Sequence, residues 1–542
     1  MKKIIFFLFF AFSILRLFAQ EWVPDPVKKF NMIYYDSYGD CLLTASDSLF
    51  LSGYFFRIGD IETRWIAKYY NGDWYPLRGG VRNVTSMIYS NGNLFVSSMG
   101  AASNSVDSPY VDVWGTEGLS RWESATGLWK PIGNNSTTGG GVFTIEYYDN
   151  KLFAAGNFNV VGNTWVYQKP VYFDGTDWHK AGYNVPIFDI LKRNNSDLLA
   201  SGAPNFFYKY EGDSTWSQNP YGGCSYYWKM EKDTINDFLY VGGSFAYICT
   251  NPPLISYGIA MWDQFQWHSF GTKITNAIGA MQVYNGYLYA AIGADTLADG
   301  TQVNYIARWD WETQSWYPLG SGLNDIPNDL EEFKDTLFVT GHFTIANGDT
   351  AIGIARWYMP DTNCKYLMPM IHTLALQDTF NLWQGQAQVQ FYNNNKYAQS
   401  WEWDFDDGSM DFVQNPVHIY TDSGAYNVTV TVTDNGCVKT AEKTIVVMVL
   451  SGEEEITPDK IEFNIYPNPT TGDVTAECNI PAGMTNAQIM VNDSFGYEKF
   501  KRDLQPGFNK FEIRSSIWPK GWYLAGVYGG NKQIVTRKFV KE

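Results

Sequence analysis

A unit of about fifty residues recurs along the first two thirds of the chain, and this repeat restricts the possible folds more than any other feature. Its general form is Leu-Tyr/Phe-Val-x-Gly-x-Phe, a variable loop, Ile-Ala-x-Trp/Tyr, a glycine turn and Trp-x-Pro-Leu-Gly, and the copy at Leu198 is degraded. The most regular copies include the segments from Ile66 to Leu77 and from Leu288 to Leu319. The first blocks of the copies begin at Leu49, Leu94, Leu152, Leu198, Leu239, Leu288 and Leu337.

Four strand-length segments joined by tight turns predict that each copy is one blade of a β-propeller. The seventh copy ends at Ile354-Ala355-Arg356-Trp357 and lacks its last strand. The segment Trp22-Val23-Pro24 has the missing Trp-x-Pro form, and pairing it there would close the ring without an exposed sheet edge. We therefore predict an all-β chain with a seven-bladed propeller over residues 20–358. Six or eight blades are the alternatives.

The composition agrees with an all-β fold. Aromatic residues make up 17% of the chain, glycine is frequent with 49 residues, and no stretch shows sustained helical periodicity. Instead, short segments rich in Val, Ile, Tyr, Phe and Trp alternate with Asn-Gly, Asp-Gly and Gly-Gly turns. The net charge of −17 gives an acidic surface that repels phosphate backbones, so we expect no nucleic-acid partner.

One face of the predicted propeller is the expected binding surface. If successive strands alternate in direction, the loop after the second strand and the loop between copies open on the same face. These loops vary most, and the longest are Met99–Gly118, Tyr247–Tyr257 and Ala294–Asn304. Variable loops on a rigid scaffold often carry binding function. The Trp that recurs once per copy is expected to pack between blades rather than to stack on sugars.

An aromatic cluster near this face supplies the candidate ligand-binding residues. They are Tyr221, Tyr226, Tyr227 and Trp228. The alternative is that residues 226–230 form an inner strand of a blade.

The N-terminal residues predict a signal peptide over residues 1–19. Lys2 and Lys3 precede an apolar run from Ile4 to Leu15, and the small residue Ala19 favours cleavage before Gln20. The apolar run is shorter than the about twenty residues that a membrane span needs. No later stretch is long and apolar enough, so we expect no transmembrane segment and export through the periplasm.

The repeat stops at Pro360, and a different motif follows over residues 359–449. The motif residues are Trp403, Asp404, Phe405, Asp407, Gly408, Asn415, Pro416 and Tyr420. This segment resembles a polycystic-kidney-disease (PKD) domain, an immunoglobulin-like β-sandwich that acts as a spacer or a weak protein or glycan binder. Asp406 stands where the family usually has glycine.

The PKD resemblance gives expectations for individual residues. Trp403, Tyr420 and Tyr426 should lie in the core of the sandwich. The nearby aspartates, among them Asp404 and Asp407, should accept hydrogen bonds from turn amides, and calcium binding is the alternative.

A second resemblance covers residues 462–542, after a charged linker at 450–461. Its motif residues are Tyr466, Pro467, Asn468, Pro469, Gly472, Gly521 and Tyr523. This segment is similar to the type A C-terminal sorting domain of the type IX secretion system of Bacteroidetes, a β-sandwich. The resemblance implies that the type IX machinery is a partner and that it carries the protein across the outer membrane to the cell surface or medium. Removal of the tail, often with attachment to surface lipopolysaccharide, is also implied.

The six cysteines do not form a CxxC pair, so a zinc site of the usual spacing is not expected. Disulfides are the default in an exported protein. Cys364 at the entry of the first strand of the PKD-like domain and Cys437 in its last hairpin would lie across one end of the sandwich, so we predict that they pair.

No catalytic motif is present. The chain has five scattered histidines and no GxSxG, HExxH or phosphate-binding glycine loop, so we predict no catalytic residue, no metal and no cofactor. The favoured hypothesis is a non-catalytic binding or adhesion protein whose propeller rim recognises a glycan or a protein. The alternative is a carbohydrate-active propeller enzyme, a glycosidase or lyase, that uses carboxylates in the channel.

Overall fold

The computed structural model is all-β in the residues that it describes, and none of these residues forms a helix. No helix in this part of the chain is therefore long and apolar enough to cross a membrane. The chain divides into two compact units, Met1–Met368 and Pro369–Glu542. The described residues are 21–23, 30, 32, 37–100, 102–103, 113, 116–133, 137–138, 141–162, 164–182, 187–193, 197–202, 206–212, 215–218, 226–248, 250, 253–271, 274, 277–311, 313–359, 367–373, 378–382, 385–395, 398–449, 461–481, 484, 486–493, 498–529 and 532–541.

Seven four-stranded antiparallel sheets make up most of the described part of the first unit. The innermost strands are β2 (Tyr38–Ala45), β9 (Val84–Ser90), β15 (Val142–Tyr148), β21 (Ile187–Lys192), β25 (Tyr226–Asp233), β31 (Ile278–Tyr284) and β35 (Pro327–Glu332). The second strands are β3 (Ser48–Tyr54), β10 (Asn93–Ser98), β16 (Lys151–Gly156), β22 (Leu198–Gly202), β26 (Phe238–Ser244), β32 (Tyr287–Ile292) and β36 (Leu337–Gly341). The first blocks of the seven sequence copies form these second strands.

The two remaining positions of each sheet lie farther from the centre of the ring. The third strands are β6 (Ile66–Tyr70), β12 (Leu119–Glu123), β19 (Val171–Phe173), β23 (Phe206–Gly212), β29 (Ile259–Trp262), β33 (Ile306–Asp310) and β39 (Ile354–Tyr358). The outer strands are β7 (Asp73–Pro76), β13 (Leu128–Pro131), β20 (Trp178–Lys180), β24 (Thr215–Gln218), β30 (Trp267–Ser269), β34 (Ser315–Pro318) and β1 (Glu21–Trp22).

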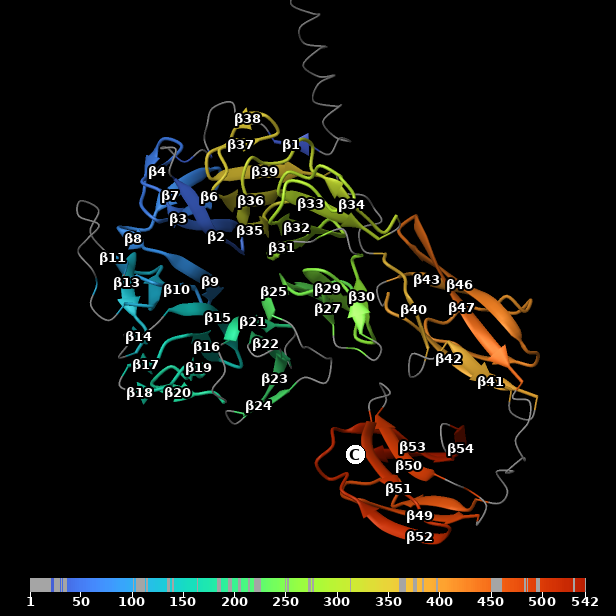
Figure 1. Cartoon of the computed structure of the whole chain (residues 1–542). Coiled ribbons are helices and arrows are strands. Elements are labelled where there is room, and N and C mark those ends of the chain that lie inside the picture. The colour runs from blue at the N-terminus through green and yellow to red at the C-terminus, as the bar shows by residue number, and fades with distance from the viewer. Residues whose placement is uncertain are drawn as a thin grey trace, which may run out of the picture. The chain divides into compact units, whose positions relative to one another are not determined.

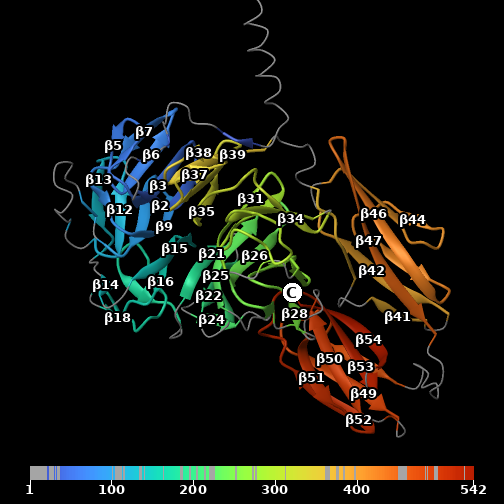
Figure 2. The same ribbon diagram turned by 45° about the horizontal axis from the view of Figure 1, so that its top comes forward.

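The sheets are arranged around a common centre in a propeller-like ring (Figures 1 and 2). The innermost strand of each sheet lies beside the innermost strands of the sheets before and after it, and β35 of the last sheet lies beside β2 of the first. The ring therefore closes on itself.

An N-terminal strand completes the last sheet, as the sequence predicts. Glu21 and Trp22 pair with Tyr358 and Trp357 at the outer edge of that sheet. The backbone N–H of Val23 adds a hydrogen bond to the carbonyl oxygen of Arg356 at 2.8 Å. The closing strand thus comes from the opposite end of the repeat region.

The recurring Trp of the outer strands packs between sheets. The indole Nε1 of Trp129 donates to the carbonyl oxygen of Leu77 in the preceding sheet at 2.9 Å. Trp22 makes the equivalent bond to Leu319 at 2.7 Å, so the N-terminal strand uses the contact of the internal repeats. The outer-strand tryptophans Trp22, Trp74, Trp129, Trp178, Trp216, Trp267 and Trp316 are all buried.

Several small sheets extend the loops on one face of the ring, which we call the rim. Because each sheet is an antiparallel meander, its second strand ends on the face where its innermost strand begins. The rim strands are β4 (Arg57–Ile58), β5 (Ile61–Glu62), β8 (Gly80–Val81), β11 (Ala102–Ser103), β14 (Thr137–Thr138), β17 (Val160–Val161), β18 (Thr164–Trp165), β27 (Tyr247–Ile248), β28 (Leu254–Ile255), β37 (Ile345–Ala346) and β38 (Asp349–Thr350).

The described residues between 371 and 448 form a sandwich of two sheets. One sheet has the order β40 (Ile371–Thr373), β42 (Ala387–Asn393), β45 (Val417–Tyr420). The other has the order β41 (Thr379–Asn381), β47 (Cys437–Met448), β46 (Gly424–Asp434), β43 (Ser400–Asp404), β44 (Met410–Asp411). Trp403 and Tyr420 are fully buried between the sheets, as the PKD resemblance implies.

The last part of the chain also forms two sheets. One contains β48 (Phe463–Tyr466), β49 (Val474–Ile480) and β52 (Gly507–Ile513). The other contains β51 (Glu498–Asp503), β50 (Ala487–Asp493), β53 (Gly521–Gly529) and β54 (Lys532–Lys541). Alternating apolar residues of β49, β50 and β53 fill one core, which explains the period of two along these strands.

Candidate functional site

The candidate ligand-binding cluster lies at the start of an innermost strand. Tyr226, Tyr227 and Trp228 belong to the backbone of β25, and Tyr221 lies outside the described residues. This placement matches the alternative interpretation, an inner strand, for residues 226–230. Whether these residues bind a ligand stays a prediction.

The three long rim segments are described to different extents. Residues 294–304 are described throughout, and Leu297 and Val303 are buried beneath the rim. Most of 99–118 and several residues of 247–257 lie outside the described residues.

Exposed apolar side chains of the first unit gather on the rim. Among the described residues, the exceptions are Tyr75 and Tyr317 on outer strands. The rim residues are Tyr54, Met99, Trp165, Tyr167, Tyr247, Ile255, Ile326 and Ile345. Large apolar side chains on loops of one face are typical of a surface that contacts a ligand.

Besides the apolar residues of the rim, the propeller unit has a group of polar side chains on its innermost strands, which line the central channel. Each innermost strand has an irregularity in its pairing with the second strand, close to its first residues. Because this β-bulge recurs at the same place, the residues that follow it lie at one level of the ring. They are Cys41, Ser86, Thr144, Asp189, Lys229, Ala280 and Asp329.

Carboxylates of the channel accept hydrogen bonds from the neighbouring sheet. Asp329 Oδ2 accepts from the backbone N–H of Leu42, and Asp189 Oδ2 accepts from that of Met230, both at 2.8 Å. Two residues farther along the strands, Glu331 Oε1 accepts from the N–H of Thr44 at 3.0 Å. An innermost strand has no paired strand on its channel side, so these carboxylates satisfy N–H groups that would otherwise lack an acceptor.

Lys229 lies among the carboxylates of the channel. Burial disfavours its charged form, but the negative charges of Asp189 and Asp329 outweigh this effect and raise the pKa of Lys229. Burial also raises the pKa of Asp189 and of Asp329, although Lys229 partly opposes the rise. The three side chains therefore form one coupled charge network across the ring.

A cavity of about 460 Å³ opens at the end of the channel opposite the rim. Its lining includes Glu231, Gln282, Glu331 and Glu332. Burial raises the pKa of Glu231 to about 8, and burial together with the charge of Asp329 raises the pKa of Glu331 to about 8. Gln282 Nε2 donates to Glu231 Oε1 at 3.3 Å. Both glutamates keep some surface open to the channel.

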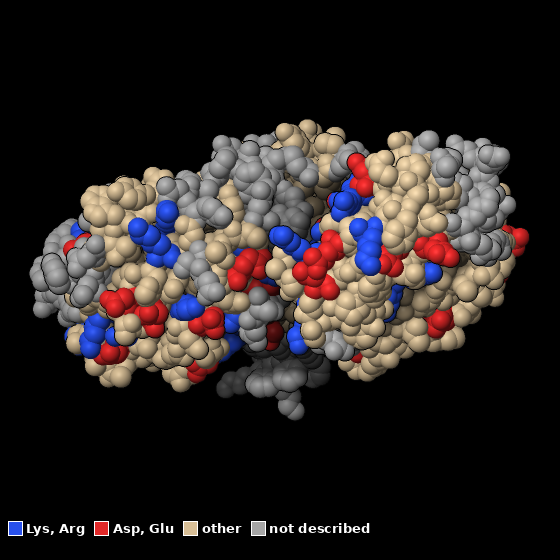
Figure 3. Space-filling view, turned by 90° about the horizontal axis from the view of Figure 1, so that it is seen from below, with Lys and Arg blue, Asp and Glu red and all other residues tan. Residues whose placement is uncertain are grey.

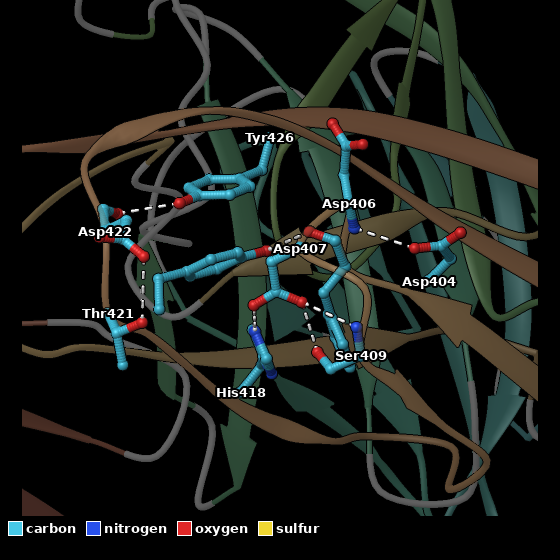
Figure 4. Close-up of polar contacts among 10 residues, drawn as sticks. Asp404, Asp406, Asp407, Ser409, His418, Thr421, Asp422 and Tyr426 are labelled. Atoms are coloured by element: carbon cyan, nitrogen blue, oxygen red, sulfur yellow. Dashed lines mark hydrogen bonds and ion pairs between the residues drawn. The ribbon is translucent and has the colours of Figure 1, made fainter.

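The acidic turn of the PKD-like domain uses its carboxylates as local acceptors (Figure 4). Asp404 Oδ1 accepts from the N–H of Asp406 at 2.9 Å, and Asp407 Oδ1 accepts from the N–H of Ser409 at 3.0 Å. Asp406 Oδ2 accepts from the N–H of Asn427 at 2.8 Å. Asp404 and Asp407 therefore accept hydrogen bonds from backbone amides of the turn, as expected.

Two further residues of the PKD motif pack beside this turn. His418 contacts Asp407 Oδ2 at 2.7 Å and stacks on Phe405 with ring centroids 4.0 Å apart. Burial tends to raise the pKa of Asp407, but hydrogen bonds from Ser409 and His418 outweigh it, so the pKa is lowered. Tyr426 differs from the expectation, because it is only half-buried and packs on Tyr420 while its hydroxyl donates to the carbonyl oxygen of Asp422.

Asn415 and Pro416 of the PKD motif join two neighbouring strands of one sheet, because they precede β45 and bond to β42. Asn415 Oδ1 accepts from the N–H of Asn393 at 2.9 Å, and the carbonyl oxygen of Pro416 accepts from the N–H of Phe391 at 2.9 Å. Gly408 has a φ of 88°, which suits glycine in this turn.

The sorting-domain motif fastens the last strand. The Asn468 amide donates to the carbonyl oxygen of Lys538 and accepts from the N–H of Val540, both at 2.9 Å. Asn468 thus pairs with β54 as a peptide group would. The prolines on either side, Pro467 and Pro469, follow cis peptide bonds.

The other motif residues surround this pairing. Tyr466 donates to Glu477, and the Gly472 carbonyl accepts from Ser515 Oγ at 2.8 Å. Gly521 pairs with Lys541 at the edge of β54. Tyr523 is buried and stacks on Phe539.

The predicted disulfide falls partly outside the described residues. Cys437 is buried at the start of β47, and Cys364 lies outside the described part of the chain. The free cysteines of the described part are Cys41 and Cys478. The pairing of Cys364 with Cys437 therefore stays a prediction.

Metal ligands are not assembled in the described part of the chain. No group of three or more His, Cys, Asp or Glu side chains is placed there so that it could hold a metal ion.

Two family models match the second unit of the chain. Residues 379–449 match the PKD domain, and residues 464–542 match the secretion system C-terminal sorting domain. With the propeller-like first unit, these matches define an exported multidomain protein. More specifically, the chain carries the sorting domain of type IX secretion, which directs it to the cell surface or the medium.

Solved structures resemble the chain only distantly. YCF48 from Cyanidioschyzon merolae is 14% identical with a TM-score of 0.39, over 64% of this chain and 99% of that one. PorZ, a surface component of the type IX secretion system of Porphyromonas gingivalis, is 10% identical with a TM-score of 0.18, over 93% of this chain and 86% of that one. No curated protein matches the chain significantly.

Proposed function

We propose that this protein is a non-catalytic binding or adhesion protein of the cell surface or medium, and that its rim recognises a glycan or a protein. The gathering of exposed apolar side chains on the rim carries this proposal. A fold that leaves several aromatic and aliphatic side chains in water on one face gains from covering them. The rim is also the face on which the loops vary most.

The proposal includes the organisation of the chain. A signal peptide over 1–19 precedes a seven-bladed propeller over 20–358, a PKD spacer over 359–449, a linker over 450–461 and a sorting domain over 462–542. The sorting domain engages the type IX machinery of a member of the Bacteroidetes and is then removed. On the face in Figure 3, charged residues of both signs are interspersed with broad uncharged areas.

The hydrogen bonds of the channel favour binding over catalysis. The carboxylates of Asp189, Asp329 and Glu331 accept from backbone N–H groups of the next sheet. A carboxylate that holds two sheets together is less available to transfer a proton to a substrate. We therefore regard these residues as structural.

One observation favours the alternative, a carbohydrate-active enzyme. Glu231 and Glu331 line the same cavity, and burial raises the pKa of each to about 8. A carboxyl group that is protonated near neutral pH is suited to act as a general acid in glycoside cleavage. In this alternative, Glu231 would be the general acid, and Glu331 would have to be ionised to act as the nucleophile or base.

A glycan and protein array with product analysis separates the two candidates. We expect the purified protein to retain a ligand without converting it, and the E231Q/E331Q variant to retain the same ligand. Turnover of a bound glycan by the wild type, lost in this variant, would establish the enzyme instead. Absence of any ligand would contradict both.

A further inference from the structure

The most exposed pair of aromatic rings on the propeller unit stands on one rim hairpin. Among the described residues of this unit, Trp165 and Tyr167 are exposed to 59% and 58%. Their ring centroids lie 5.7 Å apart, and their planes differ by 30°. The two rings are therefore stacked against each other, and each keeps more than half of its surface exposed to water.

The hairpin beneath these rings is firmly built. Val166, between the two aromatic residues, is fully buried, and it packs in one cluster with Phe158 and Val161. Backbone N–H groups of Val166 and Gln168 donate to the carbonyl oxygens of Asn159 and Phe158 at 2.7 and 2.9 Å. A rigid support means that the protein loses less conformational entropy when a ligand binds to the rings.

A tight turn follows the second strand of the hairpin and carries Tyr167. Tyr167 and Gln168 have φ angles of 51° and 61°, in the left-handed region that residues with a side chain rarely adopt. The backbone N–H of Lys169 donates to the carbonyl oxygen of Val166 at 3.2 Å, so Tyr167 and Gln168 are the central residues of a tight turn. This turn fixes the backbone that carries Tyr167.

We propose that Trp165 and Tyr167 are a stacking platform for a sugar ring of a neutral glycan. This inference rests on the proposed function and names its ligand. Aromatic rings stack on the apolar face of a pyranose, and the exposed amide of Gln168 beside them can bond the hydroxyl groups at its edge. The net charge of −17 opposes the approach of a polyanionic glycan.

The size of the platform distinguishes a glycan from a protein partner. A stable protein interface covers about 800 Å² on each side and needs several apolar anchors around its centre. Within this hairpin, the side chains next to the two rings that reach the solvent are polar: Gln168 is exposed, and Thr164 and Lys169 are half-buried. Two rings with polar neighbours suit a single sugar residue better than a protein surface.

Affinity electrophoresis of the full-length protein tests the platform. The probes are gels that contain a neutral polysaccharide, one each of β-glucan, xylan, mannan and starch. We expect at least one of them to retard the wild type, and W165A or Y167A to weaken that retardation at least tenfold. W165F, which keeps an aromatic ring, should lose less. Y75A is the matched control, because Tyr75 is 45% exposed on an outer strand, and it should bind as the wild type does.

Three results would overturn the inference. Equal retardation of the wild type and the W165A/Y167A double variant would remove the platform but leave the rim proposal standing. Failure of all four polysaccharides to retard the wild type would contradict a neutral glycan as the ligand. The glycan and protein array would then test the rim proposal separately. Loss of binding in Y75A as well would show that the effect is not specific to the hairpin. Unchanged thermal melting of each variant excludes a folding defect.

Discussion

The channel of the propeller unit and the acidic turn of the PKD domain both bring carboxylates close together, but they satisfy them in different ways. In the turn, Asp404 and Asp407 accept from amides two residues away in the sequence. In the channel, Asp329 accepts from Leu42, which belongs to the opposite end of the repeat region. The first arrangement caps a local turn, and the second holds the ring closed.

The two arrangements shift acidity in opposite directions. Hydrogen bonds from Ser409 and His418 lower the pKa of Asp407 against the effect of its partial burial. Burial raises the pKa of Asp189, Glu231 and Asp329, although each also accepts a hydrogen bond. Inside the ring, burial therefore has a larger effect on the pKa of a carboxyl group than its hydrogen bonds do. In the exposed turn, the hydrogen bonds have the larger effect on the pKa.

Removal of the central cation should have the largest effect. K229M leaves Asp189 and Asp329 without their counter-charge, and we expect the free energy of unfolding of the propeller unit to fall by about 3 kcal/mol. Urea denaturation followed by tryptophan fluorescence measures it. The triple variant K229M/D189N/D329N should recover part of the loss.

K232M is the matched control for this experiment. Lys232 lies at the channel cavity and donates to the carbonyl oxygen of Lys192 at 2.8 Å, but it does not balance the two aspartates. A loss as large in K232M as in K229M would show that the charge network is not special.

The pH dependence of the two regions should have opposite signs. With a pKa of about 8, Glu231 and Glu331 bind more protons in the folded than in the unfolded state between about pH 4.5 and pH 8. The stability of the propeller unit therefore falls as the pH rises through this window. We expect a loss of about 2 kcal/mol between pH 5 and pH 8, less than full burial would give because both side chains face channel water. Thermal melts of the wild type and E231Q/E331Q measure it, and an equal slope in both would contradict the assignment.

Removal of a capping carboxylate should weaken only the PKD domain. D407A deprives the N–H and hydroxyl of Ser409 and the His418 ring of their acceptor, and we expect a cost of about 1–2 kcal/mol. Because the pKa of Asp407 is lowered, its contribution is present above about pH 4 and is lost as the pH falls further. Hydrogen exchange of the turn amides in the whole protein reports the change. The exposed E402Q on β43 is the control, and equal exchange in both variants would refute the cap.

A neutral link between sheets should matter least. Thr144 Oγ1 donates to Asp189 Oδ1 at 3.2 Å and accepts from the N–H of Ile190 at 3.3 Å. We expect T144V to cost about 0.5–1 kcal/mol in urea denaturation. T144S, which keeps the hydroxyl, should lose less, and a larger loss in T144S would point to packing of the methyl group instead.

The sequence predicts what recurs in it. One Trp per copy predicts a contact between sheets, and Trp22 extends that prediction to the N-terminal strand because it occupies the same place in the pattern. The PKD and sorting motifs predict their sandwiches for a similar reason, since each fixed residue has a local task. Asp406, where the PKD pattern has glycine, adopts a φ of 61° and so takes the conformation that glycine would adopt.

The sequence does not predict the residues of the channel. Asp189, Lys229 and Asp329 share no motif, and their common level depends on a bulge that leaves no mark in the sequence. The repeat does not predict the exposed rings of Trp165 and Tyr167 either, because this Trp is not the recurrent one. The one sequence signal is that the two aromatic residues flank the apolar Val166, which suggests alternating exposure. This signal can be interpreted only once the hairpin is known.

The closing strand also has a mechanical meaning. The chain leaves the ring after Tyr358, the residue that pairs with Glu21. A pull transmitted along the chain toward the C-terminus therefore loads β39 directly, and β39 is held on one side by β36 and on the other by the two residues of β1. Consider a protein that is tethered beyond its propeller and bound through its rim. In such a protein, the pairing of Trp22 with β39 and the bond from its indole to Leu319 would be the first contacts to bear the tension.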